Sequence, residues 1–404
     1  MHRTSWLAFI PFAAVSLTFS VGLHLYLYRR LVKGMTESRP ARVAGGIVFS
    51  LLGVLIVAGP LSARLVPGNR LGQAGYLWWA LGFYLFTLLV VVDLGAFLAR
   101  RAARARQREP QPQPQPRQPA APGSSAPASP ARRDFLVNAA RTTASVAAVG
   151  VTGFGFEEAW SPPRITEVPV KLPRLPSALS GLTLAHLTDV HVGAWIDRRF
   201  VEDLVERTNA LRPDAVFITG DLVDGSVRDL GPMVAPLRGL RSRFGTYFVT
   251  GNHEYYSGVG EWCTELEGMG MTVLRNRRVA LGDGSASLDL VGVDDYGGGR
   301  GLGQGADLEA AVRGRDPARA AILLAHQPKG VERAAALGIG LQLSGHTHGG
   351  QIWPWSQAVR LAYPYFKGRY QVGDLSLYVS NGCGLWGPPV RVGAPPEIVK
   401  VVLG

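Results

Sequence analysis

Two histidines separated by one residue, His346 and His348, follow a short apolar run at Ile339–Leu343. Side chains two residues apart on an extended strand point to opposite faces. The flanking glycines, among them Gly345 and Gly349, permit a tight turn in which both imidazoles can approach one point. Because neutral imidazole is the commonest protein ligand for transition metals, this segment predicts half of a metal site.

Polar clusters follow four further apolar runs, each where a strand would end. Ligands in α/β proteins gather outside the carboxyl ends of strands, so the five segments could converge on one site. Carboxylate, amide and imidazole donors together suit Mn, Fe or Zn, with Mn favoured, rather than Ca or a thiolate-preferring metal. Each cluster alone is a weak signal, and their common placement supports the prediction. The four are Asp189-Val190-His191, Gly220-Asp221-Leu222-Val223-Asp224, Gly251-Asn252-His253-Glu254 and Ala325-His326.

The elements that must position these residues are short strands and amphipathic helices, which alternate from about Ser161 onward. One helix is expected at Arg198–Leu211, with Asp197 as its N-cap and apolar residues on one face. The glycine-rich segment Gly297–Gly305 is expected to be a connecting loop rather than a phosphate-binding loop. The expected strands are Leu182–Leu187, Ala215–Thr219, Thr246–Val249, Leu288–Val293, Ala321–Leu324, Ile339–Leu343, Leu375–Val379 and Ile398–Leu403.

The ordered set Asp-x-His, Gly-Asp-x-x-Asp, Gly-Asn-His-Glu, His and Gly-His-x-His is similar to that of the calcineurin-like metallophosphoesterase family. The resemblance covers about the last half of the chain, from Leu182 onward, and five motifs in order make it specific. It implies a four-layer α/β/β/α sandwich and a phosphoesterase that uses two divalent metal ions.

The resemblance also implies a role for each motif residue. His253 would assist the leaving group or stabilise the transferring phosphoryl group, and Asp224 would orient His253. An imidazole held by a carboxylate can stay protonated near neutral pH and serve as an acid. The implied metal ligands are Asp189, His191 and His348 for the first ion, Asn252, His326 and His346 for the second, and Asp221 as the bridge between them.

Two divalent ions about 3.5–4 Å apart would clamp the attacking and leaving oxygens of an in-line displacement. They would also lower the pKa of a bridging water, so that a metal-bridging hydroxide attacks phosphorus. Gly225 stands where the protein-phosphatase members have a phosphate-binding arginine. A phosphodiester or a small phosphomonoester is therefore a better expected substrate than a phosphoprotein.

Three long apolar runs precede this domain and predict three transmembrane helices, at Trp6–Tyr28, Val43–Leu61 and Ala74–Leu98. Arginine and lysine concentrate in the first loop and after the third run, whereas the second loop holds only two arginines. Because positive residues favour the cytoplasmic side, the amino terminus and the second loop are expected outside. His24 and Asp93 lie inside these runs, where ionisable residues are candidates for function.

A segment at 107–131, rich in proline, glutamine, alanine and serine, predicts an extended linker. Residues 132–160 begin with the pair Arg132-Arg133 and continue into a weakly apolar run. They resemble a twin-arginine export signal, and the alternative is a fourth membrane anchor with a basic flank. Both interpretations place the following domain outside the cytoplasm.

The sequence thus predicts four parts: a membrane domain at 1–106, the linker at 107–131, the signal or anchor at 132–160 and the metallophosphoesterase domain at 161–404. Of the formal charge of +12, the first 133 residues carry +13, which leaves the remainder near neutral. That balance argues against nucleic acid as a partner of the catalytic domain. Cys263 and Cys383 have no metal-binding spacing, and two unpaired thiols are favoured over a single bridge.

These expectations describe a multi-pass membrane protein whose extracytoplasmic domain hydrolyses phosphoester bonds in envelope or lipid-linked substrates. An alternative is a pyrophosphate hydrolase of a nucleotide-linked lipid of the UDP-diacylglucosamine type, because relatives in lipid A synthesis share this metal set. That alternative would favour a cytoplasmic site. A non-enzymatic metal or ligand sensor is disfavoured, since all seven expected ligands are present.

Aromatic residues crowd the segment after the two histidines. They include Trp353, Trp355, Tyr363, Tyr365 and Trp386. Such side chains could wall a substrate cleft or rest on a membrane surface, and ordinary packing is the alternative.

Overall fold

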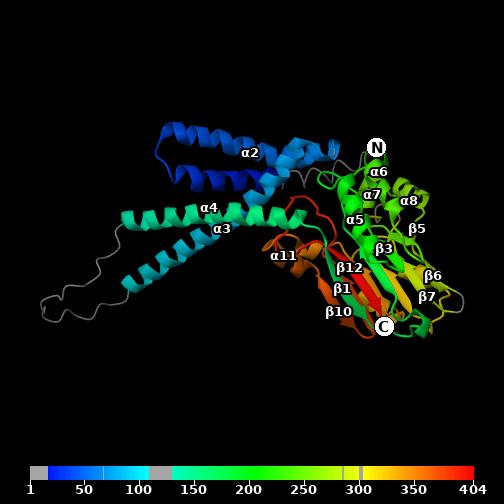
Figure 1. The fold of residues 1–404 in the computed structure, drawn as a ribbon. Helices are drawn as coiled ribbons and strands as arrows, with labels where there is room; N and C mark the ends of the chain where they lie inside the picture. The colour runs from blue at the N-terminus through cyan, green and yellow to red at the C-terminus, as the bar shows by residue number, and fades with distance from the viewer. Residues whose placement is uncertain (1–16, 67, 109–129, 284–285, 300–303) are drawn as a thin grey trace. The chain divides into compact units, whose positions relative to one another are not determined.

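The computed structural model describes residues 17–66, 68–108, 130–283, 286–299 and 304–404. The chain forms two compact units (Figure 1). One unit comprises Met1–Gly59 and Ala74–Gly153, and the other comprises Pro60–Gln73 and Phe154–Gly404. The four-part division expected from the sequence stays a prediction.

The first unit is helical in its described part. Residues 17–28 are helical and run into a short π-helix, η1 (Arg29–Lys33), while the start of the expected first span lies outside the described residues. Two of the described helices are long and apolar enough to cross a membrane, Arg39–Ala63 with 25 residues and Arg70–Ala105 with 36. They suggest membrane association. The long helices are α2 (Arg39–Leu65), α3 (Arg70–Arg108) and α4 (Pro130–Trp160), and α4 includes the Arg132-Arg133 pair.

Both ionisable residues inside the apolar runs have partners in this unit. Asp93 forms ion pairs with Arg30 at 2.7 Å and with Arg141 at 3.1 Å. His24 accepts a hydrogen bond at its Nε2 from the indole of Trp78 at 2.9 Å. A charged or polar side chain among apolar helices is costly unless it is paired. These contacts therefore give Asp93 and His24 a structural role.

The second unit contains two six-stranded sheets. Strands β2, β3, β4 and β5 run parallel in the first sheet, and β7, β8, β9 and β11 run parallel in the second. The antiparallel pairs are β12 with β2, β10 with β11 and β6 with β7. The first sheet has the order β1 (Arg164–Val170), β12 (Glu397–Leu403), β2 (Thr183–Leu187), β3 (Ala215–Thr219), β4 (Thr246–Val249), β5 (Thr272–Val273). The second has the order β10 (Gly368–Val372), β11 (Leu375–Val379), β9 (Leu341–Ser344), β8 (Ala321–Leu324), β7 (Ala286–Gly292), β6 (Arg277–Asp283).

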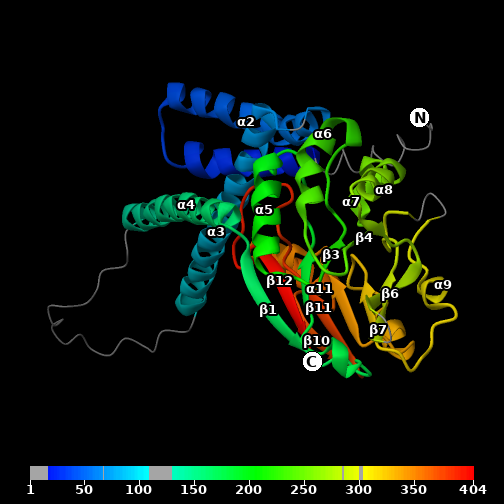
Figure 2. The same ribbon diagram turned by 45° about the vertical axis from the view of Figure 1, so that its right-hand side comes forward.

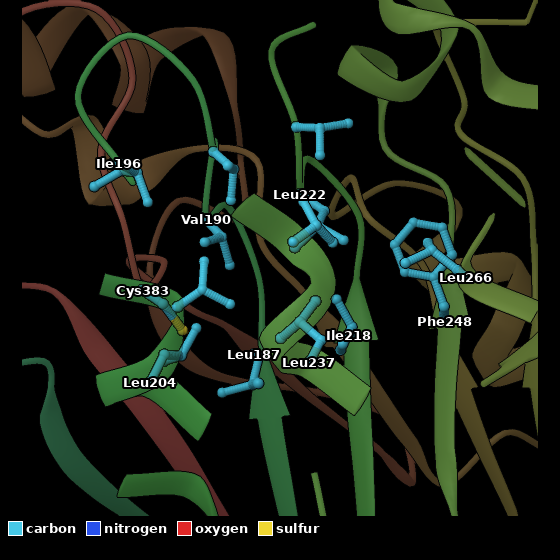
Figure 3. Packing of buried hydrophobic residues seen from close by; sticks show 14 of the residues in the cluster. Leu187, Val190, Ile196, Leu204, Ile218, Leu222, Leu237, Phe248, Leu266 and Cys383 are labelled. Atoms are coloured by element: carbon cyan, nitrogen blue, oxygen red, sulfur yellow. The ribbon is translucent and has the colours of Figure 1, made fainter. Parts of the chain in front are cut away.

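Successive side chains along each buried strand point to opposite faces of the sheet, so each sheet packs against helices on one face and against the other sheet on its other face. In β3, Val216 and Ile218 join the cluster shared with the helices, whereas Ala215 and Phe217 join the cluster between the two sheets. Figure 3 shows the helix-side cluster, where Leu204 lies near Leu187 of β2 and Leu266 near Phe248 of β4. This cluster contains residues from α5 (Arg198–Ala210), α6 (Val227–Val234) and α8 (Val259–Gly268), whose helices lie together in Figure 2.

A third cluster joins the outer face of the second sheet to α9 (Leu308–Val312) and α10 (Val331–Ala336). The order of layers is therefore helices, sheet, sheet and helices. This confirms the α/β sandwich expected from the sequence. Both cysteines are buried and free, in line with the favoured expectation of unpaired thiols.

The expected interior strands agree with the structure to within two residues at each end. The expected helix at Arg198–Leu211 is α5, and the Asp197 carboxylate accepts hydrogen bonds from the backbone of Arg199 and Phe200. Sequence patterns missed β1, β5, β6 and β10, all four of which lie at sheet edges. Edge strands are half exposed, so they lack the continuous apolar runs of strands buried on both faces.

Candidate metal centre

The expected site residues come together at one edge of the sandwich. They follow the carboxyl ends of β2, β3 and β4 in the first sheet and of β8 and β9 in the second. Among the residues that the structure describes, three sets of side chains could each hold a metal ion, because the donor atoms within each set lie within 4.8 Å of one another. The sets are Asp189, His191 and His348; His191, Asp221 and His253; and Asp221, His326 and His346.

The first set has the spacing of a shared ion. The two Nε2 atoms of His191 and His348 are 3.1 Å apart, and Nε2 of His348 lies 3.3 Å from Oδ1 of Asp189. Ligand atoms at about 2.0–2.2 Å from one ion lie roughly 3.0–3.5 Å from each other. These three side chains therefore fit a metal ion.

The set of Asp221, His326 and His346 shows the same spacing. Nε2 of His326 lies 3.2 Å from Oδ2 of Asp221 and 3.2 Å from Nδ1 of His346. The other ring nitrogens are held elsewhere, His326 Nδ1 by the carbonyl of Thr219 at 2.7 Å and His346 Nε2 by the hydroxyl of Tyr363 at 2.8 Å. A hydrogen bond on the far nitrogen fixes the tautomer and orientation that metal binding requires.

Asp221 and Asn252 offer further oxygen atoms as metal ligands. Oδ2 of Asp221 lies 3.2 Å from His326 and 3.7 Å from His191, one residue from each set. Oδ1 of Asn252 is buried and has no hydrogen-bond partner in the described structure. Leaving a buried acceptor unpaired costs about 1–3 kcal/mol, and a bound cation would satisfy it. The orphaned oxygen is therefore an independent sign that the residues fit metal.

Backbone strain concentrates at the same positions. A non-glycine residue with positive φ is uncommon, costs of order 1–3 kcal/mol and clusters at functional sites. Such residues persist only where the surroundings fix them. The expected ligands with positive φ are Asp189 (53°), His191 (53°), Asp221 (51°), His346 (72°) and His348 (51°).

Asp224 connects two histidines with different expected roles. Its Oδ1 accepts hydrogen bonds from Nδ1 of His191 at 2.9 Å and from Nδ1 of His253 at 2.6 Å. Burial lowers the pKa of His253, but Asp221 and Asp224 outweigh it and raise that pKa to about 9. Although burial opposes ionisation of Asp224, the two histidines hold the pKa of its carboxyl below the usual range.

Gly345 is required by the close approach of the histidine turn to Asp189. The backbone N–H of His346 donates to both carboxylate oxygens of Asp189, at 2.9 and 3.0 Å. A Cβ at Gly345 would overlap Oδ2 of Asp189. The turn therefore brings both histidines to the site only if this position lacks a side chain.

Glu254 is a functional residue to which the sequence motifs assigned no role. Its buried carboxylate accepts backbone hydrogen bonds from Asp221 at 2.9 Å, Leu222 at 2.8 Å and Gly251 at 2.6 Å. It thereby ties the loop after β3 to the loop after β4. Its place three residues after the N-cap Gly251 is the available sequence signal, because that spacing is typical of a capping box.

Arg391 is a second missed residue, and no sequence motif marks it. Its side chain is fully buried and donates to the carbonyls of Gly384 at 2.9 Å, Ala394 at 2.8 Å and Asn381 at 2.9 Å. A guanidinium nitrogen also lies 3.4 Å from Nδ1 of His348. Burial lowers the pKa of Arg391 to about 10. Arg391 therefore holds the 381–394 loop against the back of a candidate ligand.

Replacing Arg391 with methionine should lower the free energy of unfolding by about 3 kcal/mol or more. Each buried carbonyl that loses its donor costs about 1–3 kcal/mol. A fall in thermal midpoint, measured on the full chain, checks the prediction. Arg333→Met is the matched control, because Arg333 forms an exposed ion pair with Glu309. Equal midpoints for the two variants would contradict the proposed support.

Aromatic rings line the side of the site that holds His253. Trp386 and Tyr256 lie 5.6 and 5.4 Å from the His253 ring, between centroids. Their side chains remain 49% and 72% exposed, so they border an open site. Tyr363 contacts the site through its hydrogen bond to His346.

Comparison with known proteins identifies the family of this chain. The calcineurin-like phosphoesterase profile matches residues 182–350. The chain is 40% identical over 276 residues to a metallophosphoesterase of Helicobacter pylori. The aligned region covers 68% of this chain and 73% of that protein. The chain belongs to the calcineurin-like metallophosphoesterase family. It is accordingly a hydrolase that acts on ester bonds, in a family that uses divalent metal ions.

Other metallophosphoesterases are similar over the same region. The chain is 42% identical over 261 residues to a transmembrane protein with metallophosphoesterase domain from Bos taurus, covering 62% of this chain and 59% of that protein. Among solved structures, a dimetal phosphatase from Danio rerio aligns with a TM-score of 0.38 and 14% identity. The alignment covers 55% of this chain and 93% of that one.

Proposed function

We propose that this chain hydrolyses phosphodiester or phosphomonoester bonds with a dinuclear centre of divalent metal ions, Mn favoured. The ions would polarise the phosphoryl group and activate the attacking water. The first would be held by Asp189, His191 and His348, the second by Asn252, His326 and His346, with Asp221 shared. The observation that carries the proposal is the position of Asp221 Oδ2, within 3.7 Å of a histidine from each set.

The remaining residues move protons and fix positions. His253 lies with Nε2 3.9 Å from Asp221 Oδ2 and makes its Nδ1 bond to Asp224, so Nε2 is free to donate toward a leaving oxygen. A positioned acid contributes about 10²–10⁴-fold to rate. Asp224 holds His253 and His191 in one arrangement, and Glu254 fixes the backbone beneath Asp221.

The test is a substrate panel on the purified full chain with metal content measured on the same sample. We expect about two ions per chain and turnover of bis(p-nitrophenyl) phosphate with Mn. A p-nitrophenyl phosphate arm separates diesters from monoesters. Stoichiometric metal without turnover on either ester would reject the enzyme and favour a metal sensor.

We further propose that the natural substrate is an envelope or lipid-linked phosphoester, with the catalytic domain outside the cytoplasm. The arginine distribution around the apolar runs and the Arg132-Arg133 segment support this topology. Protease added to intact cells should then cleave the catalytic domain. Full protection would place it inside and favour the second candidate, pyrophosphate hydrolysis of a nucleotide-linked lipid.

A further inference from the structure

Helix α11 (Trp355–Ala362) turns its apolar side outward. Leu361 is 90% exposed and Trp355 is 56% exposed, whereas the polar Ser356 is the buried residue of the helix. Ala358 is exposed as well, so the exposed apolar residues recur at a spacing of three. A helix on a soluble domain normally shows the reverse pattern, with its apolar stripe on the core. The α11 surface, defined as Trp355, Ala358 and Leu361, therefore needs an occupant.

The segment that contains α11 carries only positive charges of its own. Residues 353–370 contain Arg360, Lys367 and Arg369 and no aspartate or glutamate. Arg360 and Lys367 line one cavity of about 320 Å³ together with Ser356, Gln357, Gly393 and the aromatic residues Trp353, Phe366 and Tyr370. The cavity thus offers cations and hydrogen-bonding groups on the polar side of the helix. This chemistry suits an anionic group of modest size.

Apolar residues beside basic ones on one short helix are the pattern of a segment that lies in a bilayer interface. The catalytic domain, moreover, is covalently joined to two helices long and apolar enough to cross a membrane. Such tethering keeps the effective concentration of lipid high. A protein partner would have to compete with that lipid at the same surface.

We infer that the α11 surface docks on an anionic lipid bilayer, with Trp355 and Leu361 in the interface and Arg360 and Lys367 on the headgroups. The surface is joined firmly to the metal centre. Tyr363, which ends α11, bonds to His346, and the hydroxyl of Thr347 donates to the carbonyl of Phe366 at 2.6 Å. Docking would hold the site at the headgroup layer, where phosphoester bonds of lipids lie. Only this last step rests on the proposed function.

The test measures how deeply a probe on α11 enters the lipid bilayer, and it does not require enzymatic turnover. Leu361→Cys in the full chain is labelled with an environment-sensitive fluorophore, since the native cysteines are buried. The protein is placed in nanodiscs of phosphatidylcholine alone or with phosphatidylglycerol at 30 mol%, and quenched by doxyl lipid or aqueous iodide. Ala318→Cys is the matched control, because Ala318 is exposed before the amino end of β8, away from the metal centre.

We expect the probe at 361, and not at 318, to be quenched by doxyl lipid in the anionic discs. Arg360→Gln with Lys367→Gln should lower the ratio of docked to free surface by roughly fivefold for each cation, from the attraction of one basic residue to anionic lipid. Raised salt should act in the same direction. Quenching by iodide alone, or equal doxyl quenching in both lipids, would overturn the inference. Protection from both quenchers would show a protein cover and overturn it too.

Discussion

Asp221→Asn should lose both bound metal and activity while the fold remains. The Asp221 carboxylate lies within 3.7 Å of a candidate ligand histidine from each metal set. Asparagine keeps the oxygen that accepts from the backbone of His253 and tolerates the φ of 51° at this position. It removes the negative charge that would hold two cations together. Bound ions contribute several kcal/mol to the transition state, so kcat/KM should fall on the order of 10³-fold or more.

Metal stoichiometry and kcat/KM on bis(p-nitrophenyl) phosphate, measured on one preparation, check this expectation. Asp203→Asn is the matched control, because it makes the same change in a half-exposed ion pair with Arg207 at 2.6 Å. Exposed pairs of this kind contribute about 0–1 kcal/mol, so the control should keep its metal and its rate. Two tightly bound ions in Asp221→Asn would show that this carboxylate is not the bridge.

The sequence predicted the part of the site that is formed by polar residues directly following strands. Five strands ending in polar residues were enough to place Asp189, Asp221, Asn252, His326 and His346 at one edge, because parallel strands bring their carboxyl ends together. The structure also places His346 beside His326 and His348 beside His191, which are the pairs that the family resemblance implied; their roles as metal ligands stay a prediction. The sequence predicted a tight glycine-permitted turn here, whereas the positive φ angles of His346 and His348 emerge only from the structure.

Other features depend on contacts between distant segments and leave no local mark. Arg391 reaches the back of His348 across 43 residues, and its role exists only because the 381–394 loop folds over the turn. Asp224 was expected to serve His253 alone, yet the fold also brings it to His191. The outward apolar face of α11 is similarly invisible in sequence, since a stripe at helical spacing predicts burial as readily as exposure.

His253→Gln should reduce turnover without loss of metal, in contrast to any ligand replacement. His253 contacts Asp224 and Asp221 but is 15% exposed toward solvent, which leaves its Nε2 open to substrate. Loss of a general acid should cost about 10²–10⁴-fold in kcat. The cost should be large for an ester with an alkoxide leaving group. It should be much smaller for p-nitrophenolate, which departs without a proton.

Comparison with Asp224→Asn distinguishes the role of His253 as a general acid from a role in holding the metal ligands in place. Because Asp224 holds both His253 and the candidate ligand His191, this variant should lose turnover and also bind metal about 10–100-fold more weakly. Titration calorimetry with Mn on both variants measures the difference directly. If His253→Gln bound metal as weakly as Asp224→Asn, or lost equal activity on both leaving groups, His253 would be a structural residue of the metal site instead of the acid.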